Sequence, residues 1–137
     1  QWTGHQKAVS KVCWGRASRR LYSCGRDTSI IQWSMESEAP LQVMEGHEYS
    51  VTAISLSTDE GWLCSGSRDT SVAVWDLGTA KRTMNAKIPR NLVTCVKWFK
   101  GEQQFVQGAE DLRLRVWDCR QRPLKTASTI GHGDYFA

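Results

Sequence analysis

Long apolar runs are absent from this 137-residue chain, and no stretch approaches the roughly 18–20 residues that a membrane-spanning helix needs. No signal peptide opens the sequence, and no Asn-x-Ser/Thr acceptor for glycosylation occurs. Charges of one sign form no block, so a nucleic-acid-binding tail is not indicated. The net charge of +4 permits an acidic partner without identifying one. These absences favour a cytoplasmic protein that binds neither membrane nor nucleic acid.

Cysteine occurs in no arrangement that marks a disulfide framework or a zinc site. The five cysteines are odd in number and include no CxxC pair. We expect four of them to lie in strands, where a free cysteine behaves as a small buried hydrophobe. The five are Cys13, Cys24, Cys64, Cys95 and Cys119. We therefore expect no metal and no cofactor.

Proline is scarce, with three residues against eleven glycines, which leaves room for many tight turns between short strands. What the sequence has in abundance is repetition. Trp33, Trp75 and Trp117 are spaced 42 residues apart, and an aspartate stands six positions before each of them. Such a period falls in the roughly 40–45-residue range of four-stranded propeller blades.

Aligned on these tryptophans, the copies share several further positions. They read SCGRDTSIIQWS (23–34), SGSRDTSVAVWD (65–76) and QGAEDLRLRVWD (107–118), and Gly-His pairs stand at 4–5, 46–47 and 131–132. Gly-His, an aspartate and a tryptophan recurring in one register resemble the WD-repeat family, over nearly the whole chain.

This resemblance implies an all-β fold built from three four-stranded antiparallel blades of a β-propeller. The repeats run roughly over 6–47, 48–89 and 90–132, with 133–137 beginning the next blade. Closed propellers need about four to eight blades, and the usual ring in this family has seven. We therefore expect the chain to be part of a longer chain or of a larger complex.

Two-residue periodicity places the strands of the middle copy. We expect them at Val51–Leu56, Trp62–Ser65 and Val72–Asp76, with an outer strand around Lys81–Ala86. One such sheet cannot bury both faces alone, so neighbouring blades should stack face to face.

Each repeat also carries polar residues that admit two interpretations. The resemblance assigns them to a structural tetrad that links histidine, serine, aspartate and tryptophan by hydrogen bonds. The tetrads would be His5, Ser23, Asp27 and Trp33 in the first repeat, and His47, Ser65, Asp69 and Trp75 in the second. The same residue types could form a hydrolase triad, but neither an oxyanion hole nor a G-x-S-x-G elbow is visible.

The third repeat departs from this pattern. Pro89 stands where the histidine is expected and Gln107 replaces the serine, which leaves Asp111 and Trp117. We expect this blade to lack the internal tetrad and to open at a lower free energy than its neighbour.

Partner binding in this family uses loops at the ends of the central channel. The resemblance transfers that role to nine positions, which could alternatively be solvated loop residues. They are Lys7, Ser10, Arg26, Tyr49, Thr52, Arg68, Asn91, Thr94 and Glu110. Arginine and tyrosine are enriched among residues that dominate interface energy, and the arginines favour an acidic partner segment.

Three functions follow as alternatives. The first is a non-catalytic scaffold that docks protein partners. The second is a substrate receptor of a cullin-type ubiquitin ligase, because Trp117-Asp118-Cys119-Arg120 is similar to the WDxR box of some WD-repeat proteins. The third is a propeller hydrolase. The segments 64–70 and 89–94 and the strand with Trp98 are also similar to ciliary members of the family, which implies a ciliary or cytoskeletal assembly.

Overall fold

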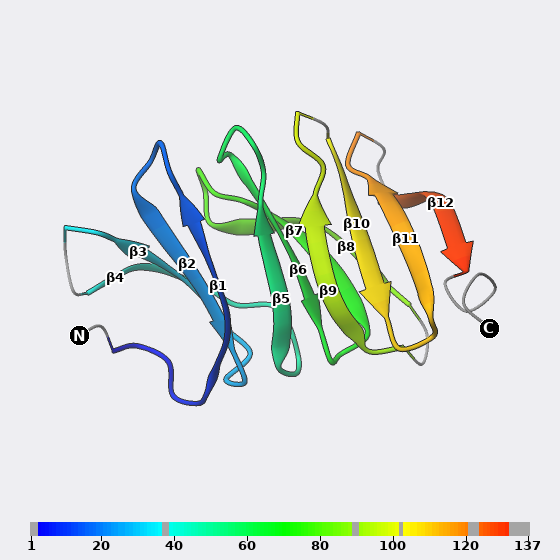
Figure 1. Ribbon diagram of the computed structural model, residues 1–137. Coiled ribbons are helices and arrows are strands. Elements are labelled where there is room, and N and C mark those ends of the chain that lie inside the picture. The colour runs from blue at the N-terminus through cyan, green and yellow to red at the C-terminus, as the bar shows by residue number, and fades with distance from the viewer. Residues whose placement is uncertain (1–2, 37–38, 89–90, 102, 121–123, 132–137) are drawn as a thin grey trace.

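A computed structural model describes residues 3–36, 39–88, 91–101, 103–120 and 124–131. Twelve strands in these ranges form three four-stranded antiparallel sheets, which we call blades 1 to 3 (Figure 1). Blade 1 contains β1 (Val9–Gly15), β2 (Arg20–Gly25), β3 (Ile30–Ser34) and β4 (Pro40–Met44). Blade 2 contains β5 (Val51–Leu56), β6 (Trp62–Ser67), β7 (Ser71–Asp76) and β8 (Lys81–Lys87). Blade 3 contains β9 (Val93–Trp98), β10 (Gln104–Ala109), β11 (Arg113–Asp118) and β12 (Lys125–Gly131).

Each blade is a meander in which consecutive strands pair, so every connection is short. The strands expected in the middle copy agree with β5 to β8, and the all-β partial propeller is confirmed. In the described part of the chain no helix is long and apolar enough to cross a membrane. Pro89, His132 and residues 133–137, on which earlier expectations depend, lie outside the described residues.

The blades stand side by side, with the first strands β1, β5 and β9 adjacent to one another (Figure 1). The turns that join second to third strands lie along one edge, lower in Figure 1, and the turns that join first to second strands lie along the other. Equivalent residues of different blades therefore gather at the same edge, although they are far apart in sequence.

Apolar side chains fill both junctions between blades. Tyr22 and Ile30 of blade 1 pack with Ile54 and Trp75 of blade 2. On its other face blade 2 packs Val72, Val74 and Met84 against side chains of blade 3 such as Phe105. Each fully buried aliphatic or aromatic side chain contributes about 1.5–3 kcal/mol relative to exposure, so a blade depends on its neighbours.

The middle blade is covered on both faces, whereas the end blades are not. Val51 and Ile54 of β5 are 0% and 8% exposed, but their counterparts in β1, Val9 and Val12, are 52% and 68% exposed. The sequence pattern is the same, and only the presence of a neighbouring blade differs. Gly66 shows how close the neighbours are, because a Cβ there would collide with the side chain of Val93.

One expectation about the cysteines was wrong. All five thiols are free, and Cys24 and Cys64 are buried as expected, but Cys95 is exposed although it lies in β9. Its side of β9 faces away from blade 2, and no other described blade covers it. Cys13 and Cys119 are half-buried, and burial raises the pKa of the Cys13 thiol to about 12, so this thiol stays protonated near neutral pH.

Candidate functional site

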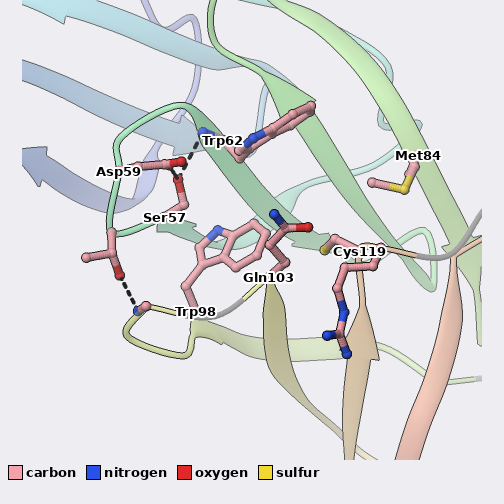
Figure 2. Close-up of a pocket in the computed structure, with 10 residues that line it drawn as sticks. Ser57, Asp59, Trp62, Met84, Trp98, Gln103 and Cys119 are labelled. Atoms are coloured by element: carbon pink, nitrogen blue, oxygen red, sulfur yellow. Dashed lines mark hydrogen bonds between the residues drawn. The ribbon is translucent and has the colours of Figure 1, made fainter.

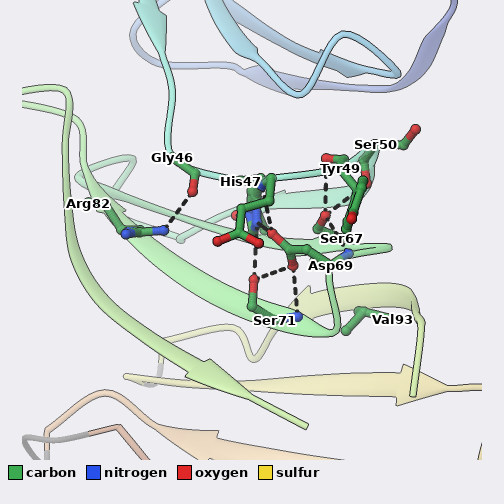
Figure 3. A network of polar contacts seen from close by, with 12 residues as sticks. Gly46, His47, Tyr49, Ser50, Ser67, Asp69, Ser71, Arg82 and Val93 are labelled. Atoms are coloured by element: carbon green, nitrogen blue, oxygen red, sulfur yellow. Dashed lines mark hydrogen bonds and ion pairs between the residues drawn. The ribbon is translucent and has the colours of Figure 1, made fainter. Parts of the chain in front are cut away.

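A chain of hydrogen bonds links four polar side chains of blade 2. Figure 3 shows the part of it formed by His47 and Asp69, with Ser71 beside them. Trp75 Nε1 donates to Ser65 Oγ at 2.8 Å, and Ser65 Oγ lies 2.7 Å from His47 Nε2. His47 Nδ1 lies 3.0 Å from Asp69 Oδ2. The loop before β5, the strand β6, the turn after it and the strand β7 each supply one member, so the network joins that loop to the β6–β7 hairpin.

The order of donors follows from what each group can do. An indole N–H only donates and an ionised carboxylate only accepts, so the serine and histidine relay between them. Burial raises the pKa of Asp69, but hydrogen bonds from His47, Ser71 and the Glu48 amide outweigh it, and the net pKa lies below its usual range. Asp69 is therefore ionised near neutral pH.

Ser65 and His47 have the spacing of a nucleophile and its base, yet the surroundings oppose catalysis. Ser65 is 0% exposed, and its Oγ already accepts from Trp75 Nε1. A substrate cannot reach this hydroxyl without taking the blade apart. The geometry therefore favours the structural interpretation of the network over a hydrolase triad.

Blade 1 brings its four residues together in the same way. Trp33 Nε1 donates to Ser23 Oγ at 2.8 Å, and Ser23 Oγ lies 2.7 Å from His5 Nε2. His5 Nδ1 lies 3.0 Å from Asp27 Oδ2.

A fifth residue, which the sequence analysis missed, joins each of these two networks. Ser29 Oγ donates to Asp27 Oδ1 at 2.9 Å, and Ser71 Oγ donates to Asp69 Oδ1. A signal was available, because both serines stand two positions after the turn aspartate and are themselves 42 residues apart.

Blade 3 holds other contacts at the positions where the tetrad is missing. Asp111 is bound by the guanidinium of Arg115, and Trp117 Nε1 donates to Gln107 Oε1 at 3.2 Å. The longer glutamine side chain supplies to Trp117 the acceptor that serine supplies in the other blades. Arg115, on β11, binds the turn aspartate, which histidine binds in the other blades. Blade 3 thus holds two separate pairs instead of one chain, and Gln107 Nε2 is buried with no partner among the described residues.

The turn aspartates also shape the turns themselves. The backbone amide two positions later donates to the carboxylate in each blade, at 3.3 Å in blade 1, 2.9 Å in blade 2 and 3.2 Å in blade 3. The residue between them has a positive φ, namely 69° at Thr28, 73° at Thr70 and 65° at Leu112. A β-branched or bulky residue is strained there, so the side-chain bond helps to hold the turn.

The nine residues predicted to bind a partner lie along the edge formed by these turns and by the segments that enter β1, β5 and β9. We call this edge the rim. Seven of the nine side chains are exposed: Lys7, Ser10, Arg26, Tyr49, Arg68, Thr94 and Glu110. Asn91 and Thr52 are half-buried, and Thr52 Oγ1 donates to the carbonyl of Val93 at 2.6 Å, which ties blade 2 to blade 3.

The backbone holds the three turn positions of the rim alike. The amides of Arg26, Arg68 and Glu110 donate to carbonyls of the segment before the first strand, at 2.9, 3.0 and 3.2 Å. Their side chains are exposed while the following aspartate points into the blade. Among the described residues no group of three or more His, Cys, Asp or Glu side chains could hold a metal ion.

Comparison with solved structures finds the same fold in larger proteins. The chain is similar to the structures described as "Structure of U3-55K" and "Crystal structure of RRP9 WD40 repeats", each with a TM-score of 0.86 and 24% identity over 93% of this chain. It is also similar to the β-propeller domain of Cps50 (Swd1) from Myceliophteria thermophila, with a TM-score of 0.83 and 20% identity over 92% of this chain. The chain spans 40% of the length of each of these structures.

A search of curated proteins gave no match, so the similarity to ciliary proteins stays a prediction. The family described as "WD domain, G-beta repeat" matches residues 1–34, 38–76 and 78–118, which is most of the chain. The chain therefore belongs to the WD-repeat family of β-propellers, which are generally non-enzymatic modules for protein interaction.

Proposed function

We propose that this chain is a non-catalytic scaffold that docks a protein partner on the rim. The observation that carries the proposal is the repeated placement of Arg26 and Arg68. Both side chains are exposed, both amides are fixed to the preceding segment, and both precede a buried aspartate network. A fixed backbone lowers the conformational entropy that a binding surface loses, because only the side chains remain to be ordered.

The partner that fits the two arginines is an acidic segment. A guanidinium can bind a carboxylate through two parallel hydrogen bonds, which adds specificity to charge attraction. Lys7 adds a further exposed positive charge on the rim, and Tyr49, 62% exposed, adds an amphipathic ring of the kind found in interface hot spots. Glu110 at the third equivalent position limits the basic surface to blades 1 and 2.

The test is capture of partners by the full-length protein with Arg26→Ala and Arg68→Ala combined. We expect the affinity for the dominant partner to fall about tenfold, which corresponds to about 1.4 kcal/mol, with nearly unchanged thermal stability. The matched control replaces Arg16 and Lys100, two exposed cations on the opposite edge, and should leave binding intact. Unchanged affinity in the double variant would show that the arginines of the rim do not bind the dominant partner.

A second candidate function rests on Arg120. The buried Asp118 accepts hydrogen bonds from Nε and Nη2 of Arg120 at 3.0 and 2.8 Å, which orients a side chain that is 60% exposed. An arginine held in this way could attach the propeller to a ligase adaptor through the WDxR-like box. Co-precipitation of a cullin-type ligase adaptor that is lost on Arg120→Ala would favour this function, and its absence from wild-type precipitates would exclude it.

We also propose a cytoplasmic location within a ciliary or cytoskeletal assembly, supported by the sequence similarities alone. Imaging of the tagged full-length protein in ciliated cells tests it. A diffuse signal that does not concentrate at the cilium or its base would contradict the ciliary part.

A further inference from the structure

A pocket of about 600 Å³ opens between blades 2 and 3, on the edge opposite the rim. The turn between β5 and β6 contributes Ser57 and Asp59, β6 contributes Trp62, β9 contributes Trp98, and Met84 and Cys119 complete the apolar part. In Figure 2 the two indoles lie on different sides of the pocket, with Ser57 and Asp59 at one end and Cys119 at the other. Pockets of this size hold a side chain of a partner or a small ligand.

Trp62 departs from the repeat, because the equivalent positions hold Arg20 and Gln104, whereas Trp98 is matched by Trp14 in the first copy. The positions 42 residues before the two tryptophans, in blades 1 and 2, hold Arg20 and Leu56. Trp98 does contribute to packing, since its ring contacts Phe105 edge to face with centroids 5.5 Å apart. Its Nε1, however, is buried without a hydrogen-bond partner among the described residues, so the indole is not held in place by its polar group. Packing of a blade therefore does not require an indole pair at this junction.

Asp59 gives the pocket a negative charge. Its Oδ1 accepts from Ser57 Oγ at 2.6 Å and from the Gly61 amide at 3.0 Å, and no cation in the described part of the chain pairs with it. These two hydrogen bonds lower the pKa of Asp59, so the carboxylate is ionised near neutral pH. The charge of Arg120, which also lines the pocket, is offset by its ion pair with Asp118.

We propose that this pocket binds a cationic side chain, with arginine as the best fit, from a protein partner. Indole rings attract cations through their π-electrons, and a nearby carboxylate supplies the counter-charge. Arginine fits better than lysine because its planar guanidinium stacks on aromatic rings and is more weakly hydrated. This site differs from the rim in both place and charge, so it would let the chain bind two partners, or two segments of one partner, at opposite edges.

The test titrates the full-length protein with N-acetyl-Gly-Arg-Gly-amide while NMR follows the indole N–H signals of Trp62 and Trp98. We expect both signals to shift, with binding at least fivefold tighter than for the matched Gly-Leu-Gly peptide and no binding of the Gly-Glu-Gly peptide. A Gly-Lys-Gly peptide should bind more weakly than the arginine peptide.

Variants then separate charge from shape. Asp59→Asn keeps the size of the side chain and should weaken binding of the arginine peptide at least threefold. Asp76→Asn is the matched control, because Asp76 also accepts a glycine amide two positions later, at 2.8 Å, and does not line the pocket. Unshifted Trp75 signals in each variant show that the blade is intact. Equal binding of the leucine peptide, no effect of Asp59→Asn, or no shift with the arginine peptide would each overturn the proposal.

Discussion

In blade 2 the turn aspartate Asp69 is bound by a histidine from the preceding loop, whereas in blade 3 its counterpart Asp111 is bound by Arg115 from the following strand. Both aspartates nevertheless accept the backbone amide two positions later, and both precede a residue with positive φ. The comparison separates two roles of one residue. Shaping the turn needs only the aspartate, while joining the loop to the sheet needs the whole chain of side chains.

The largest difference should appear when the aspartates are removed. Asp69→Ala leaves His47 and Ser71 without their acceptor in a buried site and should lower the free energy of unfolding by about 1–3 kcal/mol. Asp111→Ala removes a partly exposed ion pair and should cost less than about 1 kcal/mol. Chemical denaturation of the full-length protein measures both. Asp59→Ala is the comparison in an exposed turn, where the carboxylate accepts from Ser57 Oγ and the Gly61 amide, and it should cost less than Asp69→Ala. Equal midpoints for the three variants would refute the distinction between the blades.

Acid should affect blade 2 more than blade 3. The net pKa of Asp69 is depressed in the fold, so its contribution to stability is complete above the unfolded value of about 3.9 and is lost as the pH falls further. We therefore expect Asp69→Asn to flatten the fall in unfolding free energy between about pH 5 and pH 2. The guanidinium of Arg115 also lowers the pKa of Asp111, so Asp111→Asn should flatten the same curve by a smaller amount. A steeper curve in either variant would contradict this assignment.

The hydrogen-exchange rates of the indole N–H protons should differ between Trp75 and Trp117. The indole N–H of Trp75 donates at 2.8 Å to Ser65 within a continuous network, while that of Trp117 donates at 3.2 Å to an isolated glutamine. We expect the Trp117 indole proton to exchange about tenfold faster, because local opening of blade 3 breaks fewer linked bonds. NMR of the full-length protein gives both rates in one sample. Identical rates would mean that the two blades open together.

The smallest effect is expected from Gln107→Leu. The substitution removes a buried amide nitrogen that has no partner among the described residues, and it leaves Trp117 Nε1 without its acceptor. These two changes oppose one another, so stability should change by less than about 1 kcal/mol. A loss above about 2 kcal/mol would show that Gln107 has a partner that the described residues do not include.

The repeat predicted what depends on local pattern and register. Strands β5 to β8 follow from two-residue alternation between turn residues, and the network of His47, Ser65, Asp69 and Trp75 follows from the family resemblance. Arg115 could not be found in this way, because its position is occupied by Ile31 and Ala73 in the other repeats and only the turn brings it to Asp111.

Features that depend on contact between blades could not be predicted from the sequence either. Cys95 and Cys64 both lie in strands, and which face a neighbouring blade covers decides that one is exposed and the other buried. The pocket between Trp62 and Trp98 likewise joins residues of two repeats, and the pattern within one repeat does not show that they meet.

The family repeats and the blades are offset by one strand. The segment 38–76 contains β4 of blade 1 together with β5, β6 and β7 of blade 2, and the segment 78–118 likewise contains β8 with β9, β10 and β11. If one such segment were duplicated, its first strand would complete the sheet before it and its other three strands would begin a new blade. The preceding sheet would therefore keep its outer strand. Conversely, a shortened protein that ends at the last residue of a repeat, at Asp76 for example, would lack β8, the outer strand of blade 2. Truncations of this protein should instead end between blades, after β4 or β8.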